Sequence, residues 1–189
     1  MTLDLLIPAQ LMHALLPDLV LMGGAMVLML VAAWRPDSAA HQRTVGIGAM
    51  MLIVVAIATV IHMAVGGYTA AGGGVIAVDG FRWALDLIVL LGALATIALS
   101  IEQNVRDGIG AGESHVLVLF AAAGMMVLVA GRDLMVIFLG IEIMSVAVYV
   151  LAGIDRRRVR AAEASLKYFL LGAFASGFLL YGIALIYGA

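Results

Sequence analysis

Two ionisable residues interrupt long apolar stretches of this chain of 189 residues. Glu142 stands in the middle of the apolar run over residues 134–151, and Lys167 stands near the start of the run over residues 164–187. A charge at the centre of a lipid bilayer costs at least about 2.5–3.5 kcal/mol, so ionisable residues there are by default functional and often form proton relays. We therefore predict that Glu142 and Lys167 take part in moving protons.

The spacing of these two residues predicts that they lie at similar depth. The connection between the two runs is centred between Ile154 and Asp155, about 12 residues from Glu142 and about 12 from Lys167. At 1.5 Å per residue, an antiparallel hairpin places both of them roughly 10–15 Å inward from the loop. The spacing leaves open whether the two side chains face each other or point apart.

Polar neighbours extend this prediction to a seam of hydrogen-bonding groups. Ser145 and Tyr149 follow Glu142 at i+3 and i+7, which places all three on one helix face and makes the two hydroxyls candidates for a proton relay. Glu163 precedes Lys167 by four residues, the favourable order for an ion pair within a helix.

Each of the two charges also has a structural interpretation. Glu142 can anchor its helix through a hydrogen bond to a neighbouring serine or to backbone. Lys167 can extend to the membrane interface, since it lies less than two turns from Arg160. The sequence leaves these alternatives open.

The remaining ionisable residues are assigned structural places. Asp18 follows Pro17 in a pattern typical of a helix start, and Asp86 lies about one turn into an apolar run. His115 is assigned to a loop. No two histidines or carboxylates have the spacing of metal ligands, so we predict neither a metal site nor a cofactor-binding site.

Six apolar runs must position these residues. Each is long enough to cross a hydrocarbon core of roughly 30 Å, which takes about 17–25 helical residues. In lipid every backbone amide needs a partner within its own segment, so the runs are predicted to be helices. The sequence thus predicts an all-α integral membrane protein, a single domain over residues 1–189. Its six helices are expected at residues 15–34, 44–65, 83–101, 114–130, 134–151 and 164–187.

Composition supports the membrane assignment. Hydrophobic residues make up 65% of the chain and charged residues 12%, against about 45–50% and about 25% in soluble domains. This excludes a soluble enzyme and a disordered chain. The net charge of -2 offers no basic surface for nucleic acid. The chain has no cysteine, which excludes disulfides and cysteine-ligated iron–sulfur clusters.

Arginine placement predicts the orientation of the bundle. The loops after the first, third and fifth runs carry seven arginines, whereas the opposite side has only Arg82 and Arg132. Because cytoplasmic loops are enriched in basic residues, both termini are predicted to face the exterior, periplasmic side. The glycine-rich segment over residues 66–82 is expected to be a flexible outer loop. The seven arginines are Arg35, Arg43, Arg106, Arg156, Arg157, Arg158 and Arg160.

Three motifs in the right order resemble the subunit N family of bacterial NADH-quinone oxidoreductase, respiratory complex I. Residues 139–153 (LGIEIMSVAVYVLAG) and residues 163–188 (EASLKYFLLGAFASGFLLYGIALIYG) flank an arginine-rich loop. Residues 16–24 (LPDLVLMGG) are similar to the first helix of that family. The resemblance covers essentially the whole chain and is most specific over residues 133–187.

The resemblance implies a proton-pumping, antiporter-like subunit of the bacterial inner membrane. In that family the fifth-helix glutamate, here Glu142, couples electrostatically to lysines on other helices, and the sixth-helix lysine is here Lys167. The subunit carries no redox centre, because NADH, FMN, iron–sulfur clusters and quinone belong to other subunits. The implied partners are the other membrane subunits, protons and the lipid bilayer.

One departure concerns length, since family members have about fourteen helices and this chain has six runs. We therefore expect an N-terminal fragment or a truncated product that holds part of one proton half-channel, a partial antiporter-like fold. Two alternatives stay open. One is a subunit of a cation/proton antiporter or membrane-bound hydrogenase of the same ancestry, and the other is a non-pumping structural membrane fragment.

Overall fold

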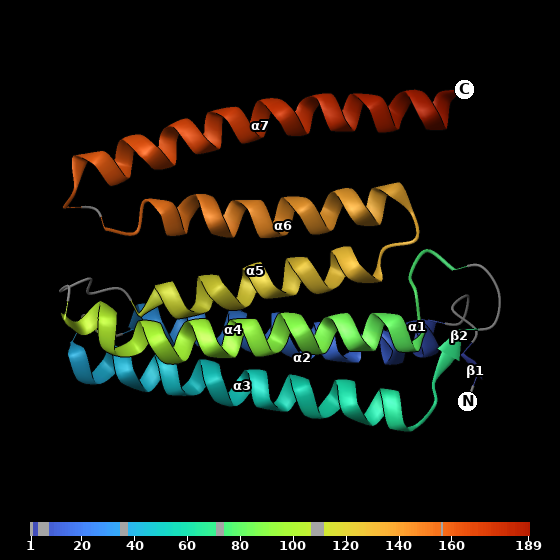
Figure 1. Cartoon of the computed structure of the whole chain (residues 1–189), viewed down its shortest axis with the longest axis horizontal. Helices are drawn as coiled ribbons and strands as arrows, with labels where there is room; N and C mark the ends of the chain where they lie inside the picture. The colour runs from blue at the N-terminus through green and yellow to red at the C-terminus, as the bar shows by residue number, and fades with distance from the viewer. Residues whose placement is uncertain (1, 4–7, 35–37, 71–73, 107–111, 156) are drawn as a thin grey trace.

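The computed structural model describes residues 2–3, 8–34, 38–70, 74–106, 112–155 and 157–189. This part of the chain is almost entirely helical (Figure 1). The strands are β1 (Thr2–Leu3) and β2 (Thr69–Ala70), which pair in parallel. The helices are α1 (Pro8–Ala14), α2 (Leu16–Trp34), α3 (Ala39–Val65), α4 (Gly80–Arg106), α5 (Glu113–Ala130), α6 (Leu134–Ala152) and α7 (Val159–Gly188).

Six of the described helices, α2 to α7, are long and apolar enough to cross a membrane, which confirms the predicted helical membrane class. Three of them extend well beyond the runs that predicted them, since α3 begins at Ala39, α4 ends at Arg106 and α7 begins at Val159. An apolar run stops at the first polar residues, whereas helical hydrogen bonding continues through them. At α3, for example, the Ser38 side chain accepts a hydrogen bond from the His41 backbone N–H at 3.2 Å.

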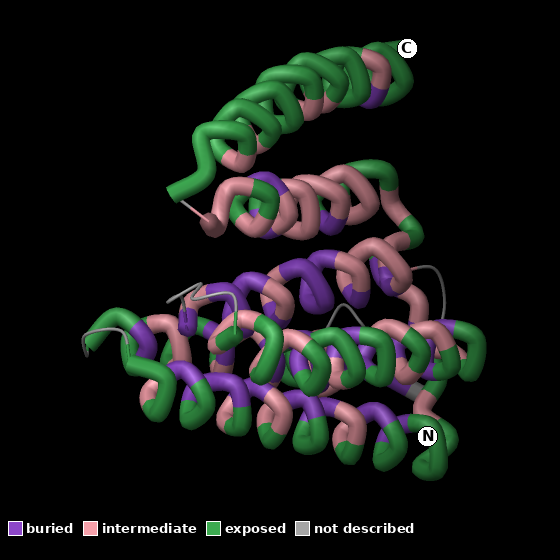
Figure 2. The backbone as a smooth tube through the Cα atoms, turned by 60° about the vertical axis from the view of Figure 1, so that its left-hand side comes forward, coloured by how far each residue is buried: buried purple, intermediate pink, exposed green. Residues whose placement is uncertain are grey.

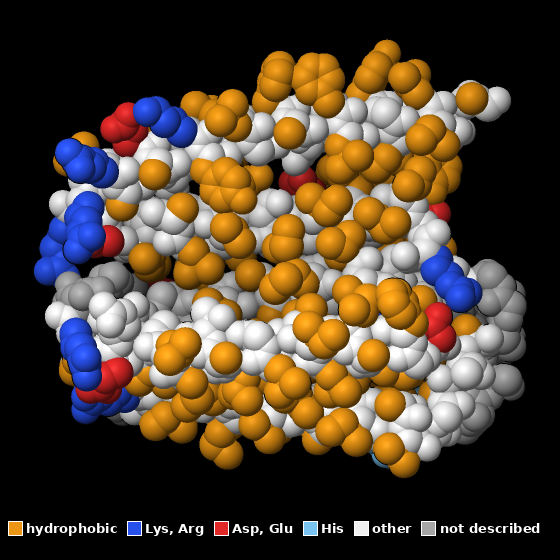
Figure 3. Space-filling view, in the orientation of Figure 1, with side chains coloured by type: hydrophobic (Ala, Val, Ile, Leu, Met, Phe, Trp, Pro, Cys, Tyr) orange, Lys and Arg blue, Asp and Glu red, His pale blue; other side chains and the backbone are white. Residues whose placement is uncertain are grey.

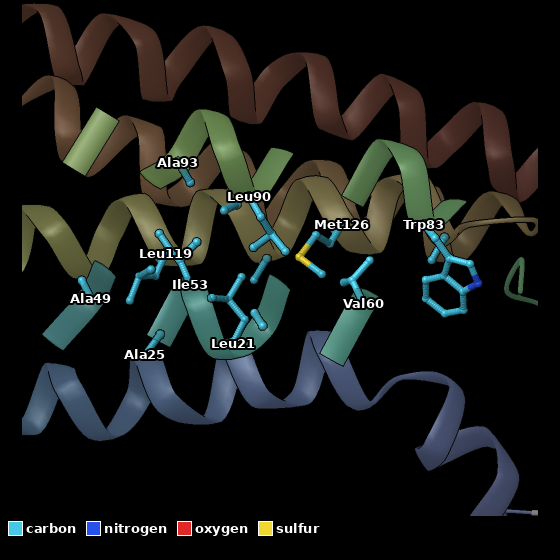
Figure 4. Close-up of a cluster of buried hydrophobic side chains, with 14 of the residues drawn as sticks. Leu21, Ala25, Ala49, Ile53, Val60, Trp83, Leu90, Ala93, Leu119 and Met126 are labelled. Carbon is cyan, nitrogen blue, oxygen red and sulfur yellow. The ribbon is translucent and has the colours of Figure 1, made fainter. Parts of the chain in front are cut away.

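Helices α2 to α5 form a bundle around one apolar core. Side chains from all four helices meet in the close-up of Figure 4. In a bilayer such a core is held by close packing, because lipid tails are as apolar as the side chains themselves. The fully buried residues include Leu21 and Ala25 of α2, Ile53 and Val60 of α3, Leu90 of α4, and Leu119 and Met126 of α5.

Helix α6 packs on α5 through two glycines that bring the backbones together. A Cβ added to Gly140 would lie 2.6 Å from the backbone nitrogen of Leu128, and one added to Gly124 would meet the backbone nitrogen of Met144. Contact at this range excludes any side chain. Small residues at helix interfaces allow this kind of approach in membranes, and here they fix the position of α6, the helix that carries Glu142.

Helix α7 forms the outermost layer. Within the described part of the chain it packs on α6 alone, and Ile183 is its one buried residue. Figure 2 shows the contrast between the largely exposed α7 and the largely buried α5. The exposed apolar side chains of α7 are those that a bilayer or another protein segment can cover. They include Phe169, Leu171, Phe174 and Phe178.

The glycine-rich segment over residues 66–82 is held in place more than its sequence indicates. Among its described residues, Ala77 donates its backbone N–H to the carbonyl of Ala130 at 2.7 Å. Val75 in turn accepts a hydrogen bond from the backbone N–H of Arg132 at 2.9 Å. Helix α4 also begins at Gly80, inside the segment predicted to be loop. These contacts join the segment to the end of α5.

Candidate functional site

Glu142 lies midway along α6 and is half-buried. The Ser176 hydroxyl of α7 donates a hydrogen bond to the Glu142 carboxylate. The same residue lines an open, mostly apolar groove of about 370 Å³ between α5 and α6, together with Leu117, Phe120, Ile143, Val146 and Ala147. The carboxylate is therefore held on one side and borders apolar space on another.

Tyr149 and Ser145 lie further along the same helix. Tyr149 is buried, and its ring packs edge-on against Tyr168, with ring centroids 4.8 Å apart. Its backbone carbonyl accepts a hydrogen bond from the Ser165 hydroxyl at 2.7 Å. Its phenol occupies the space that a side chain at Gly172 would fill. Ser145 is half-buried. The helix face that carries Glu142, Ser145 and Tyr149 is thus largely covered by the helices that pack on α6.

Lys167 lies on the exposed surface of α7. Its ammonium group forms an ion pair with Glu163 at 2.5 Å, the within-helix pair that the spacing predicts. Both side chains are well exposed, at 70% and 58%. An exposed pair of this kind stabilises a helix only slightly, typically by about 0.3–0.5 kcal/mol.

The predicted matched depth of Glu142 and Lys167 is wrong. Glu142 lies opposite Ser176, which is nine residues beyond Lys167 on α7. At 1.5 Å per residue, this separates the two charges by about 13 Å along the helix axis. Counting residues from the middle of the connection treats the hairpin as symmetric. The contact of Ser165 with Tyr149 shows instead that the first turn of α7 extends past the end of α6.

A second group of buried charges joins α2 to α4. Asp18, Arg82 and Asp86 are 2%, 0% and 0% exposed. An Arg82 Nη2 atom donates to Asp18 Oδ2 at 2.6 Å, and Arg82 Nε lies 3.4 Å from Asp86 Oδ2. We call these three residues the Asp–Arg–Asp cluster. Burying charges carries a desolvation cost that only close pairing and hydrogen bonds offset.

Of the three members of this cluster, only Arg82 lies elsewhere than predicted, since Asp18 is in the first turn of α2 and Asp86 is within α4. Arg82 was assigned to an outer loop but lies in the first turn of α4, because the Asp79 side chain accepts a hydrogen bond from the Arg82 backbone N–H and starts the helix. The predicted place of Asp18 at a helix start is confirmed, and the structure adds its ion pair with Arg82 across the bundle. One signal was available, since Arg82 and Asp86 stand four residues apart and so share one helix face.

His115 was assigned to a loop, although it falls within the predicted helix over residues 114–130. It lies in the first turn of α5 and is 0% exposed, not in a loop. Its Nδ1 atom lies 3.2 Å from the Ser100 hydroxyl of α4. Beside it, Asn104 donates a hydrogen bond to the Ser114 hydroxyl at 2.9 Å. These polar contacts tie the end of α4 to the start of α5. Throughout the described ranges, no three His, Cys, Asp or Glu side chains are grouped as metal ligands.

Comparisons with known proteins identify relatives of this chain. Residues 131–189 match a family described as NADH:quinone oxidoreductase/Mrp antiporter, TM. NADH-quinone oxidoreductase subunit N of Gemmatimonas aurantiaca is 46% identical, over 98% of this chain and 37% of the relative. The subunit N of Parvibaculum lavamentivorans is 39% identical, over 92% of this chain and 35% of the relative.

A solved structure gives the same result. The chain resembles one chain of respiratory complex I from Thermus thermophilus with bound Aureothin, with a TM-score of 0.72 and 35% identity. That match covers 92% of this chain and 36% of the other, so this chain spans about a third of the length of its relatives. It is a multi-pass membrane protein, which in bacteria means the inner membrane. Over nearly its whole length, the chain is a homologue of NADH-quinone oxidoreductase subunit N.

Proposed function

We propose that this chain forms part of a proton half-channel in a proton-pumping NADH:quinone oxidoreductase, with Glu142 as its central charge. The observation that carries the proposal is an ionisable side chain midway along an apolar helix, hydrogen-bonded by Ser176 and bordering a groove. The homology to NADH-quinone oxidoreductase subunit N supplies the reaction to which this charge would be coupled, electron transfer from NADH to quinone.

In this proposal Glu142 acts through its charge. Two unit charges about 8 Å apart, at an effective dielectric of about 20, interact by about 2 kcal/mol. That free energy corresponds to a change of about 30-fold in proton affinity. A lysine that approached Glu142 to this distance would bind a proton, and it would release the proton when the two separated.

Lys167 is proposed as a proton-uptake residue rather than as the direct partner of Glu142. The axial separation of about 13 Å limits their interaction to about 1.3 kcal/mol at the same dielectric. The ion pair with Glu163 also draws the Lys167 ammonium toward the start of α7, away from Glu142. Ser145, Tyr149 and water are the proposed carriers between the two charges.

The distribution of basic residues supports a topology with both termini on the exterior side. Figure 3 shows most of the visible lysine and arginine side chains at one end of the molecule, where α3 and α7 begin and α4 ends, and a smaller basic group at the other end. Basic residues favour the cytoplasmic side. Arg35 and Arg156, which contributed to the predicted orientation, lie outside the described residues. Both chain termini lie at the opposite end (Figure 1).

The proposed assembly extends beyond this chain. Its residues would form one transmembrane unit within a longer subunit, packed against other membrane subunits and lipid. NADH, FMN, iron–sulfur clusters and quinone would be held by other subunits. The chain would then belong to an enzyme complex without carrying a redox centre of its own.

A second candidate function is a subunit of a cation/proton antiporter or a membrane-bound hydrogenase of the same ancestry. The description of the matching family, which includes the Mrp antiporter, favours keeping it. Proton movement that depends on an external cation and not on quinone would identify the antiporter. A third candidate is a structural membrane fragment that does not pump protons. In that case Glu142→Gln would leave proton pumping unchanged.

The test is made in the assembled complex that contains this chain, reconstituted in lipid vesicles. We expect Glu142→Gln and Glu142→Ala to abolish most quinone-coupled proton pumping, because the charge that biases the lysines is gone. Lys167→Met is expected to slow pumping. Glu102→Gln is the matched control, since its carboxylate forms an exposed ion pair with Arg43 at 3.1 Å. Wild-type pumping and quinone reduction in all variants would contradict the proposal.

A further inference from the structure

The Asp–Arg–Asp cluster contains one more negative than positive group. All three side chains lie inside the bundle, where water does not compensate a charge. Among the described residues, Arg82 is the one cation that forms an ion pair with either carboxylate. An ionised carboxylate in such a place needs a close donor or an equal counter-charge, since desolvation otherwise outweighs its attraction to a distant cation.

The guanidinium of Arg82 is not shared equally between the two carboxylates. Its Nη2 atom donates to Asp18 Oδ2 at 2.6 Å, within the range of a strong charge-assisted hydrogen bond. Its Nη1 atom donates to the carbonyl of Ala77 at 2.9 Å, and its Cζ atom lies 4.7 Å from the ring centre of Trp83. Asp18 is therefore the principal counter-ion of Arg82.

Asp86 is left without a hydrogen-bond donor. Its Oδ2 atom lies in ion-pair contact with Arg82 Nε at 3.4 Å, but within the described residues neither of its oxygens has a hydrogen-bond partner. The Oδ1 atom of Asp18 also lacks one. A proton on Asp86 would balance the cluster's charge and add an O–H donor where three carboxylate oxygens lack one.

The other ionisable groups at this end of the bundle make contacts elsewhere. Asp79 pairs with Arg132 at 3.8 Å, and Asp133 accepts a hydrogen bond from a tyrosine of α7. The two histidines of α1 and α3, His13 and His62, flank the ring of Tyr68. Helix α5 carries no ionisable residue over 116–130. Within the described structure, Arg82 and Asp18 are thus the charged groups that determine whether Asp86 is protonated.

We propose that Asp86 is a proton-binding site, which holds a proton at neutral pH while Asp18 remains the ionised partner of Arg82. Loss of that proton would leave two carboxylates competing for one guanidinium, so proton binding at Asp86 would be linked to the Asp18–Arg82 contact that joins α2 to α4. The site lies at the opposite end of the bundle from Lys167.

The first test compares thermal unfolding of the full chain in detergent micelles at neutral pH. Asp86→Asn and Asp86→Leu replace a neutral side chain by a neutral one of similar size, so their melting temperatures should stay within about 3 °C of wild type. Asp18→Asn removes a charge that Arg82 needs and should lower the melting temperature by about 10 °C or more. Equal losses at the two aspartates would overturn the proposal in favour of a three-member ion network.

The second test observes the proton directly. The infrared spectrum of the wild-type chain should contain the carbonyl stretch of a buried protonated carboxylic acid at neutral pH. The band should vanish in Asp86→Asn or Asp86→Leu, whichever is measured. It should remain in Asp133→Asn, the control, because the pKa of Asp133 is lowered and its carboxyl is ionised at neutral pH. A wild-type spectrum without a band that depends on Asp86 would overturn the proposal, as would failure of both Asp86 variants to fold.

Discussion

At the scale of single residues, the local partner of Glu142 is a hydroxyl and not a lysine. The hydrogen bond from Ser176 compensates part of the cost of placing a carboxylate in an apolar helix, since hydrogen bonds to charged groups contribute about 1.5–3 kcal/mol. A neutral donor lowers that cost without cancelling the charge. The charge of Glu142 thus remains available to act on cations that lie further away, as the proposed coupling requires.

Asp133 provides a pH-dependent contact outside the membrane-spanning segments. The hydrogen bond from the Tyr187 hydroxyl holds the pKa of Asp133 below its usual range, and the backbone N–H of Met135, at 2.8 Å, acts in the same direction. A carboxyl whose pKa is lowered by folding stabilises the protein at neutral pH. That contribution is lost as the pH falls through the lowered pKa.

We therefore expect Asp133→Ala to reduce the thermal stability of the chain in detergent at neutral pH. The difference from wild type should shrink as the pH falls from about 4, the ordinary pKa of an aspartate, through the lowered pKa of Asp133. Tyr187→Phe removes the hydrogen bond that contributes most to the lowered pKa of Asp133. In this variant the stability of the chain should therefore change less between neutral and acid pH. A difference that stayed constant from neutral to strongly acid pH would show that Asp133 acts by packing instead.

At the scale of helices, α5 and α6 are joined by backbone contact at two glycines. A methyl group at Gly124 would meet the backbone of Met144, which cannot move as a side-chain end can. We expect Gly124→Ala to lower the free energy of unfolding by about 1–3 kcal/mol, the usual cost of overpacking. Thermal or denaturant unfolding in detergent measures the effect.

Gly92 of α4 supplies the matched control for that prediction. A Cβ added there meets nothing within 4 Å, and the residue is exposed. Gly92→Ala should therefore be neutral or stabilise the helix by up to about 1 kcal/mol, through helix propensity alone. Equal effects of the two substitutions would mean that α5 and α6 are not held in close contact.

At the scale of the whole molecule, the proposed topology places both termini and the β1–β2 pair outside. The chain has no cysteine, so single-cysteine variants can report topology without background. In intact cells, a membrane-impermeant thiol reagent should label Thr69→Cys of β2, which is exposed. It should label Ser38→Cys, the exposed cap of α3, only after the membrane is opened. The reverse pattern would invert the topology.

The sequence by itself determined the class of this protein and the number of its long helices. Apolar runs of membrane-crossing length are a local property, because in lipid each helix satisfies its own backbone. The resemblance to NADH-quinone oxidoreductase subunit N also rested on residues adjacent in the chain. The i,i+4 pair of Glu163 and Lys167 was predictable for the same reason, since both members lie on one helix.

Only the tertiary structure decided which residues meet across helices. The offset of Glu142 from Lys167 depends on how far α7 extends past α6, which residue counting does not show. The Asp–Arg–Asp cluster depends on α2 lying beside the start of α4, although Asp18 and Arg82 are 64 positions apart in the chain. Contacts of this kind are set by the packing and rotation of whole helices, and a local apolar pattern specifies neither.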